Sequence, residues 1–155
     1  MIALRAVGPA DGDALHAIFT EPGVRRFLFD GIELSRAETR MHVDAACTQA
    51  AWTIRQDDEI VGLVGLRPVG DGADHELIVA LSERCWGSGV AFQACRQAMQ
   101  HGFDELAFAR ILATVDLPNE RSHRLMARLG FQATGEGEGP KYRFRTYEAL
   151  RRSGT

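Results

Sequence analysis

Long apolar runs are missing from this 155-residue sequence. A membrane-spanning helix needs about 20 consecutive apolar residues, and charged side chains interrupt every apolar run before that length. We also expect no secretory leader, because Arg5 and the acidic residues from Asp11 onward interrupt the N-terminal region. We therefore expect a cytoplasmic protein that has no membrane partner.

Cysteine is scarce, and the three that occur are Cys47, Cys85 and Cys95. None has C-x-x-C spacing or a histidine at ligand spacing, so we expect neither a disulfide framework nor a metal site. Each lies in an apolar neighbourhood, where a free cysteine acts as a small hydrophobic side chain. Free thiols agree with a reducing cytoplasm.

An excess of positive charge is also absent, since the net charge is −3 and the pI is about 5.9. This balance argues against a nucleic-acid partner held mainly by charge. Residues 1–77 hold 13 acids and 7 bases, a net −6, whereas residues 78–155 hold 8 acids and 11 bases, a net +3. The first half would favour a cationic partner and the second an anionic one, although a random surface asymmetry explains the difference equally well.

The sequence contains no internal repeat, low-complexity tract or linker. With 45% hydrophobic and 25% charged residues, it has the composition of a globular protein. Its length is that of one domain, and we expect a single domain over residues 1–155.

Hydrophobic periodicity and turn signals predict an α+β chain around one mixed sheet. Ser35 and Glu38 form a capping box at the start of one helix. The strand at 75–81 is apolar enough to be buried on both faces, and it leads through a helix to a parallel strand. The expected strands are 2–7, 51–55, 60–69, 75–81, 110–116, 131–134 and 142–150, and the expected helices follow residues 9–11 and cover 36–49, 89–105 and 119–130.

The most informative segment is Trp-Gly-Ser-Gly-Val-Ala at 86–91, between a buried strand and the first turn of a helix. The first N–H groups of a helix have no partner and its dipole is positive there. Gly87 and Gly89 would let a ligand approach the backbone, which makes this turn a candidate phosphate site. The alternative is a tight turn that binds nothing. A Walker A loop is excluded because no Gly-Lys-Ser/Thr occurs, and a dinucleotide fingerprint is excluded because Phe92 occupies its third glycine position.

Four short motifs occur together in a specific order and spacing. They are Glu76-Leu77-x-x-x-Leu81, Trp86-Gly87-x-Gly89-x-Ala91, Asn119-x-x-Ser122 and Leu129-Gly130-Phe131. Through these motifs the chain resembles the GNAT superfamily of acyl-CoA-dependent N-acetyltransferases, and is most similar to its ribosomal-protein alanine acetyltransferase (RimJ/RimL-like) branch. The resemblance extends to about Tyr147 and implies a single GNAT-type domain, with six to seven mostly antiparallel strands flanked by about four helices.

The resemblance implies acetyl-CoA as co-substrate, with its pyrophosphate on the glycine turn and its pantetheine arm beside the strand at 75–81. The family's loop motif can be placed with Arg84 or with Trp86 at its first position, and we prefer Trp86. Either choice names the same loop. The implied cofactor-binding residues are Val79, Ala80, Leu81, Trp86, Gly87, Ser88, Gly89, Val90, Ala91 and Asn119.

In this family the acceptor amine attacks the thioester directly, so the enzyme mainly places two substrates. Glu76 is the candidate general base; His75 and Asp74 are the alternatives, and Glu76 is otherwise a solvated strand-end carboxylate. Ser122 is the candidate donor of a proton to the leaving thiolate, or else it caps a helix. Met126 stands where many relatives have a tyrosine, and Gln93 where this branch commonly has a glutamate.

The acceptor is expected to be a primary amine, either a protein N-terminus or a small molecule. Its site is expected to be lined by Phe27, Phe29 and Trp52, although an aromatic run of this kind can also be core. Two other functions stay open, an acyl-CoA-binding sensor without turnover and a structural domain with an empty loop. The sequence leaves homodimer formation open.

Overall fold

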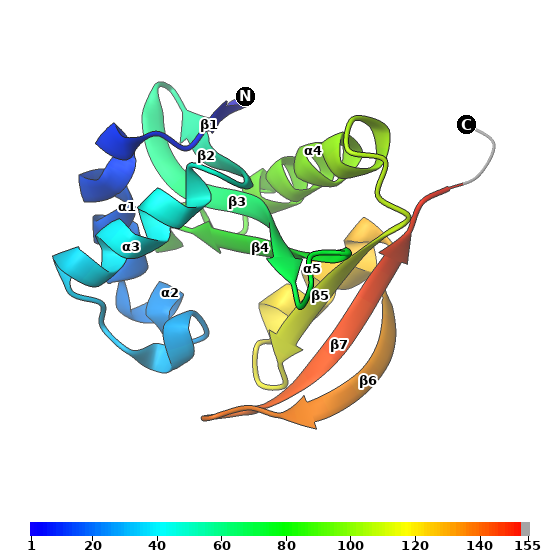
Figure 1. Cartoon of the computed structure of the whole chain (residues 1–155). Helices are drawn as coiled ribbons and strands as arrows, with labels where there is room; N and C mark the ends of the chain where they lie inside the picture. Colours follow the sequence, from blue (N-terminus) through cyan, green and yellow to red (C-terminus); the bar gives the residue numbers. More distant parts are fainter. Residues whose placement is uncertain (153–155) are drawn as a thin grey trace.

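The computed structural model describes residues 1–152. Its centre is one seven-stranded sheet with the order β1-β2-β3-β4-β5-β7-β6 (Figure 1). Only β4 and β5 are parallel, and every other neighbouring pair is antiparallel. The prediction of an α+β chain around a mixed, mostly antiparallel sheet is confirmed. The strands are β1 Ile2–Ala6, β2 Ala50–Gln56, β3 Glu59–Val69, β4 Asp74–Leu81, β5 Arg110–Asp116, β6 Gln132–Glu138 and β7 Arg143–Leu150.

The helices cover both faces of the sheet. Helices α1 and α3 pack on one face, around Leu15, Val43 and Leu63, whereas α4 packs on the other, around Cys95 and Ile111 (Figure 1). The helices are α1 Gly12–Phe19, α2 Pro22–Arg25, α3 Arg36–Ala46, α4 Val90–Asp104 and α5 Glu120–Leu129, with 3₁₀ turns η1 Pro9–Asp11, η2 Phe29–Gly31 and η3 Glu83–Cys85.

The capping box at the start of α3 is confirmed. Ser35 Oγ accepts a hydrogen bond from Glu38 N at 3.1 Å, and the Glu38 carboxylate accepts one from Ser35 N at 3.0 Å. Because both bonds satisfy backbone N–H groups that a helix start leaves free, they fix where α3 begins.

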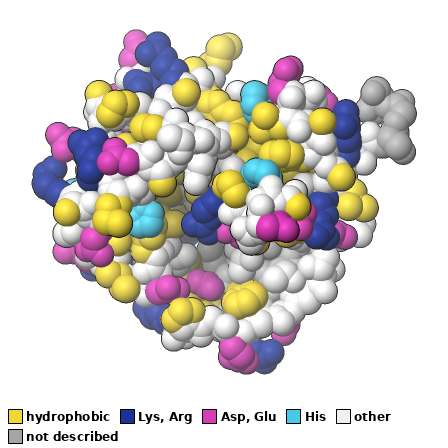
Figure 2. Space-filling model, viewed as in Figure 1, with side chains coloured by type: hydrophobic (Ala, Val, Ile, Leu, Met, Phe, Trp, Pro, Cys, Tyr) yellow, Lys and Arg dark blue, Asp and Glu magenta, His cyan; other side chains and the backbone are white. Residues whose placement is uncertain are grey.

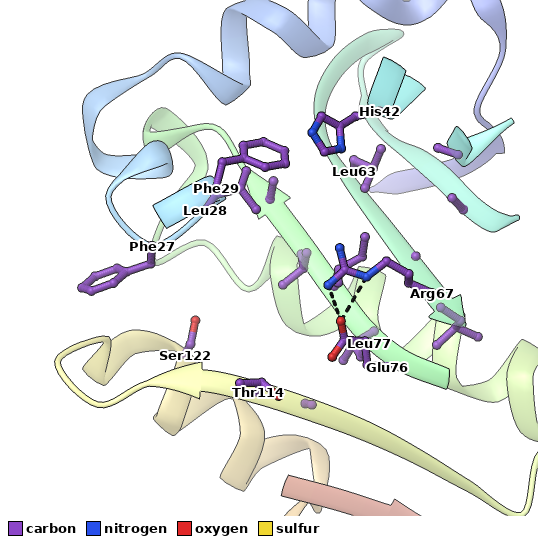
Figure 3. A pocket seen from close by; sticks show the side chains of 18 of the residues that line it. Phe27, Leu28, Phe29, His42, Leu63, Arg67, Glu76, Leu77, Thr114 and Ser122 are labelled. Carbon is purple, nitrogen blue, oxygen red and sulfur yellow. Dashed lines mark hydrogen bonds and ion pairs between the residues drawn. The ribbon is translucent and has the colours of Figure 1, made fainter. Parts of the chain in front are cut away.

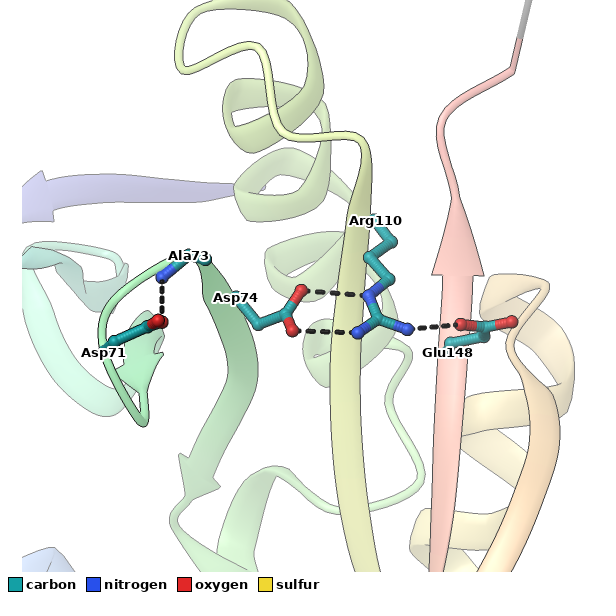
Figure 4. Close-up of polar contacts among 5 residues, drawn as sticks. All are labelled: Asp71, Ala73, Asp74, Arg110 and Glu148. Carbon is teal, nitrogen blue, oxygen red and sulfur yellow. Dashed lines mark hydrogen bonds and ion pairs between the residues drawn. The ribbon is translucent and has the colours of Figure 1, made fainter.

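The parallel strands β4 and β5 are held together at one end only. Their register contains the single pair Glu76 and Leu112. On one side of this pair, Arg110 donates to both carboxylate oxygens of Asp74, at 2.9 and 2.8 Å, and to Glu148 on β7 at 3.2 Å (Figure 4). On the other side the pairing ends, and the later residues of both strands line a cavity instead.

This divergence corrects the expectation that the strand at 75–81 is buried on both faces. Leu77, Ala80 and Leu81 are buried, but Ile78 and Val79 remain partly exposed. Their exposure follows from the missing pairing with β5, because a strand without a neighbour leaves its side chains open to the gap.

Other boundaries differ from the prediction. Strand β6 continues to Glu138 because it pairs with β7 beyond a register shift between Ala133 and Gly135, although its Gly-Glu alternation resembles a loop. Cys47 is exposed, contrary to expectation, whereas Cys85 and Cys95 are buried. Within residues 1–152, none of the helices combines the length and the apolar character that crossing a membrane requires.

Candidate active site

The glycine turn leads from the 3₁₀ turn after β4 into α4. Gly87 and Gly89 have φ values of 76° and 84°, a left-handed conformation that side chains other than glycine rarely adopt. A Cβ at either position would meet no atom within 4 Å, so the turn faces open space. Gly89 is the N-cap of α4 and has no side chain to accept from the first helical N–H groups. The turn therefore has the geometry of an anion site.

The side chains of Trp86, Ser88 and Val90 stabilise the turn by contacts inside the protein. Trp86 Nε1 donates to the Leu81 carbonyl at 2.9 Å, Ser88 Oγ donates to the Cys85 carbonyl, and Val90 is buried in the core. The Ser88 hydroxyl proton is therefore engaged and the Val90 side chain is buried, so these two residues can donate to a phosphate only through their backbone N–H groups.

Two cavities meet beside the end of β4. The first, of about 530 Å³, lies between β3, β4 and β5, α3 and the segment at 27–30, where the surface in Figure 2 is hollowed. The second, of about 410 Å³, lies between the end of β4, the glycine turn and α5. Each has a volume typical of ligand sites. Both cavities are lined by Phe27, Leu28, Val79, Ala80, Asn119 and Ser122.

An ion pair lies on the floor of the first cavity. Arg67 on β3 and Glu76 on β4 are register partners, and Arg67 donates to Glu76 Oε1 through Nε, at 3.0 Å, and through Nη2 (Figure 3). His42 of α3 lies opposite, against the ring of Phe29 at 4.4 Å between centroids. Burial lowers the pKa of His42, and the Arg67 guanidinium lowers it further, so this imidazole is mainly neutral at pH 7.

Two further carboxyl groups line the first cavity, Asp30 of the 27–30 segment and Asp116 at the end of β5. Burial raises the pKa of Asp116, and the Asp30 carboxylate raises it further. Sequence reasoning missed Asp116, along with Arg67 and His42. A usable signal existed for Asp116, because the carboxyl ends of adjacent parallel strands are where ligands commonly bind.

Most of the predicted cofactor residues line the second cavity. Arg84 instead pairs with Glu59 at 3.2 Å and does not contribute to the lining, which favours Trp86 as the first residue of the loop motif. The predicted residues that do line it are Val79, Ala80, Leu81, Trp86, Gly87, Gly89, Ala91 and Asn119.

Ser122 and Asn119 have separate roles in the structure. Asn119 Oδ1 accepts from Ser122 N at 3.4 Å and so caps α5, whereas the Ser122 hydroxyl points into the first cavity (Figure 3). The alternative that the Ser122 side chain is the helix cap is therefore wrong. Met126, which the resemblance aligns with the tyrosine of many relatives, lines the same cavity, and its thioether cannot donate a proton.

Besides Ser88 and Val90, three residues predicted for the acceptor side of the site also lie outside both cavities, namely Trp52, His75 and Asp74. Trp52 packs edge-on against His101 of α4, at 5.1 Å between centroids, so its assignment to the acceptor site is wrong. Alternation along β2 directs Ala51 to the cavity and Trp52 to the opposite face. Among the alternative bases, His75 stacks on Phe108 and Asp74 is held by Arg110.

Metal ligands do not gather anywhere in the described part of the chain. Over residues 1–152, no group of three or more His, Cys, Asp or Glu side chains is placed to hold a metal ion.

Comparison with known proteins identifies two relatives that are similar in sequence and a solved structure that is similar in fold. The uncharacterized N-acetyltransferase YoaA of Bacillus subtilis is 28% identical over 145 residues, covering 86% of this chain and 81% of its own. The spermidine N(1)-acetyltransferase of Escherichia coli K12 is 27% identical over 143 residues, covering 87% and 75%. The structure of RimL, a ribosomal L7/L12 α-N-protein acetyltransferase in complex with coenzyme A, superposes with a TM-score of 0.83 at 19% identity, covering 96% and 93%.

The family assignment rests on a match that includes every element from β1 to the start of β6. The family model described as an acetyltransferase (GNAT) domain matches residues 2–132. This range contains the diverging strands β4 and β5, the glycine turn and both cavities. Because the model matches most of the chain, the protein belongs to the GNAT family of acetyltransferases.

Proposed function

We propose that this protein transfers the acetyl group of acetyl-CoA to a primary amine, by direct attack of the amine on the thioester. The observation that carries the proposal is the pair of cavities with different chemistry that meet at Val79, Ala80, Asn119 and Ser122. The second cavity ends in an open glycine turn suited to phosphate, and the first carries acidic groups suited to an amine. The relatives named as N-acetyltransferases support the same activity.

The chain's residues fit acetyl-CoA in the second cavity. Its lining contains no Asp or Glu among the described residues, so nothing there repels phosphate. The partly exposed end of β4 leaves backbone groups beside Val79 free for an extended arm. Bound there, acetyl-CoA supplies an electrophilic thioester carbonyl at the junction of the two cavities.

Glu76 acts as the general base in this proposal. Its Oε1 is held by Arg67, which fixes the carboxylate on the floor of the acceptor cavity. The reacting amine first gives up the proton of its ammonium form to solvent and attacks as the neutral amine. As its nitrogen bonds to the carbonyl carbon, the second proton that the nitrogen must lose passes to the Glu76 carboxylate, directly or through one water. The carbon–sulfur bond then breaks, and the thiolate takes a proton from Ser122 or from solvent.

The acceptor is a cationic amine, supported by Asp30, Glu76 and Asp116 in the first cavity. The relatives point to two classes, because one is named for spermidine and another for a ribosomal protein N-terminus. A polyamine and a peptide N-terminus are therefore the two classes to test. Membership of the RimJ/RimL-like branch corresponds to the second class and is part of this proposal, as is a cytoplasmic location.

A panel of amines tests the proposal. Free CoA is measured after mixing the protein with acetyl-CoA and spermidine, Ala- or Ser-terminal peptides, or free amino acids. We expect amine-dependent CoA release with at least one class. Acetyl-CoA binding without release for any amine would favour the sensor function, which Met126 at the tyrosine position supports. Absence of binding would contradict both.

A further inference from the structure

Three arginines line the second cavity from α5. Arg121, Arg124 and Arg128 are exposed and follow the three- and four-residue spacing of one helix face. Seven residues span about 10 Å along a helix axis, so this arginine face extends beyond a single phosphate group. Sequence reasoning singled out none of the three.

The arginine face lacks acidic partners, unlike most arginines of this chain. Within residues 1–152, none of the three forms an ion pair. Nine other arginines do: Arg25, Arg36, Arg40, Arg55, Arg67, Arg84, Arg110, Arg143 and Arg145. Three unpaired guanidinium groups beside a cavity whose described lining has no carboxylate favour an anionic ligand.

Aromatic rings hold two of these guanidiniums at the edge of the glycine turn. The Arg121 guanidinium lies over the Trp86 ring at 3.5 Å, and that of Arg128 lies over the Phe92 ring at 4.3 Å. Stacking covers the flat face of a guanidinium and leaves its edge N–H groups free, in the geometry that binds phosphate oxygens in pairs. Trp86 precedes the turn and Phe92 lies in the first turn of α4, so these arginines flank the phosphate site.

The charge available here exceeds what a pyrophosphate alone needs. Helix α4 contributes about half a positive charge at its N-terminus, and the arginine face adds a formal +3. CoA carries a third phosphate, a monoester of about −2 charge at pH 7, beyond its pyrophosphate. A monoester phosphate fits the additional guanidinium groups in number and chemistry.

We propose that Arg121, Arg124 and Arg128 form a subsite for the 3′-phosphate of CoA. This subsite rests on the proposed use of acetyl-CoA. It makes the protein select donors that carry the 3′-phosphate over donors that lack it. Arg124, which lies between the two stacked arginines on the same face, completes the subsite at its centre.

Calorimetric titration with acetyl-CoA and with acetyl-3′-dephospho-CoA tests the subsite. We expect the native protein to bind the dephospho form roughly 10- to 100-fold more weakly, the loss expected for one or two charge-assisted hydrogen bonds. Substituting Gln for each arginine, singly and together, should reduce this ratio toward one. The effect should come from weaker acetyl-CoA binding, with little change for the dephospho form.

Arg96→Gln is the matched control, because Arg96 is an exposed helical arginine on α4 that lines neither cavity. It should keep the native ratio. Melting curves confirm that each variant is folded, and the single variants suffice if the triple variant is not. An equal affinity of the native protein for both donors, or an unchanged ratio in the folded variants, would overturn the subsite while leaving the proposed activity intact. Failure of acetyl-CoA itself to bind would contradict the proposed function instead.

Discussion

At the residue scale, Glu76 combines two roles in one carboxylate. It pairs with Arg67 across β3 and β4, and it lines the first cavity, which is the proposed acceptor site. We expect Glu76→Gln to lower turnover by roughly 10²–10⁴-fold near pH 7, the usual effect of losing a general base. The defect should shrink at higher pH, where more of the acceptor amine is already neutral. Initial rates from pH 6 to 9 with one good acceptor give this profile.

Glu148→Gln is the control for that measurement. Glu148 is also a strand carboxylate paired with an arginine, at 3.2 Å from Arg110, but it lines neither cavity. It should keep near-native turnover. Unchanged turnover in Glu76→Gln would remove Glu76 as the base.

Ser122 and Asn119 both lie at the start of α5, but we expect their substitution to have different effects. Loss of the Ser122 side chain should affect turnover, and loss of the Asn119 side chain should affect stability. Ser122→Ala should leave the free energy of unfolding nearly unchanged, because Asn119 supplies the cap. Turnover should fall less than about ten-fold, since a thiol with a pKa near 8.5 yields a tolerable leaving group. Asn119→Ala should instead cost about 0.5–2 kcal/mol of stability. Denaturant unfolding and initial rates of both variants test the distinction, and a Ser122→Ala variant as destabilised as Asn119→Ala would contradict it.

Local sequence patterns predicted the role of a residue well where that role depends on contacts with its neighbours in the sequence. The Ser35 and Glu38 box, the Asn119 cap and the two glycines all act within a few residues of themselves. Trp52 could not be placed in the same way, because the side it faces depends on which sheet face the cavity occupies. Arg67 and Asp116 enter the site through strand pairing and burial that no short segment reveals.

At the scale of elements, the role of the turn between η3 and α4 in binding phosphate can be tested by a single substitution. Gly89→Asp should abolish acetyl-CoA binding, because it places a carboxylate beside the expected phosphates. The substitution is also strained at φ 84°, so a control must carry the same strain. Gly70→Asp provides it, since Gly70 has φ 62° and an equally open surrounding, and lies away from both cavities.

Melting curves first establish that both variants are folded. Titration calorimetry with acetyl-CoA then tests whether the glycine turn binds phosphate. The control should bind acetyl-CoA with near-native affinity. Normal binding by a folded Gly89→Asp would contradict the phosphate role of the turn.

The helices and strands with the strongest apolar patterns were predicted most accurately. Strands β3 and β5 and helix α4 have strong patterns, and their predicted limits are close to those observed. Strand β6 is polar and exposed along Gly135–Glu138 except at the half-buried Gly137, and it is a strand only because β7 lies beside it. The divergence of β4 and β5 likewise depends on pairing between distant segments.

At the scale of the whole molecule, donor binding should stabilise the fold. Both cavities are lined by segments from the N-terminal helices to α5, so a ligand there bridges distant parts of the chain. At 100 times its dissociation constant, acetyl-CoA should add about 2.7 kcal/mol. For a chain of this size that is roughly a 5–10 °C rise in melting temperature. Differential scanning fluorimetry measures it, and no rise at millimolar acetyl-CoA would contradict donor binding.

The junction of the two cavities has a consequence for the order of events. Because the cavities proposed for donor and acceptor are separate and share one wall, neither substrate needs to leave before the other enters. The proposed transfer therefore proceeds through a ternary complex, and no acetyl group has to reside on the protein between two half-reactions. Initial rates measured at several fixed concentrations of each substrate should give intersecting, not parallel, double-reciprocal lines.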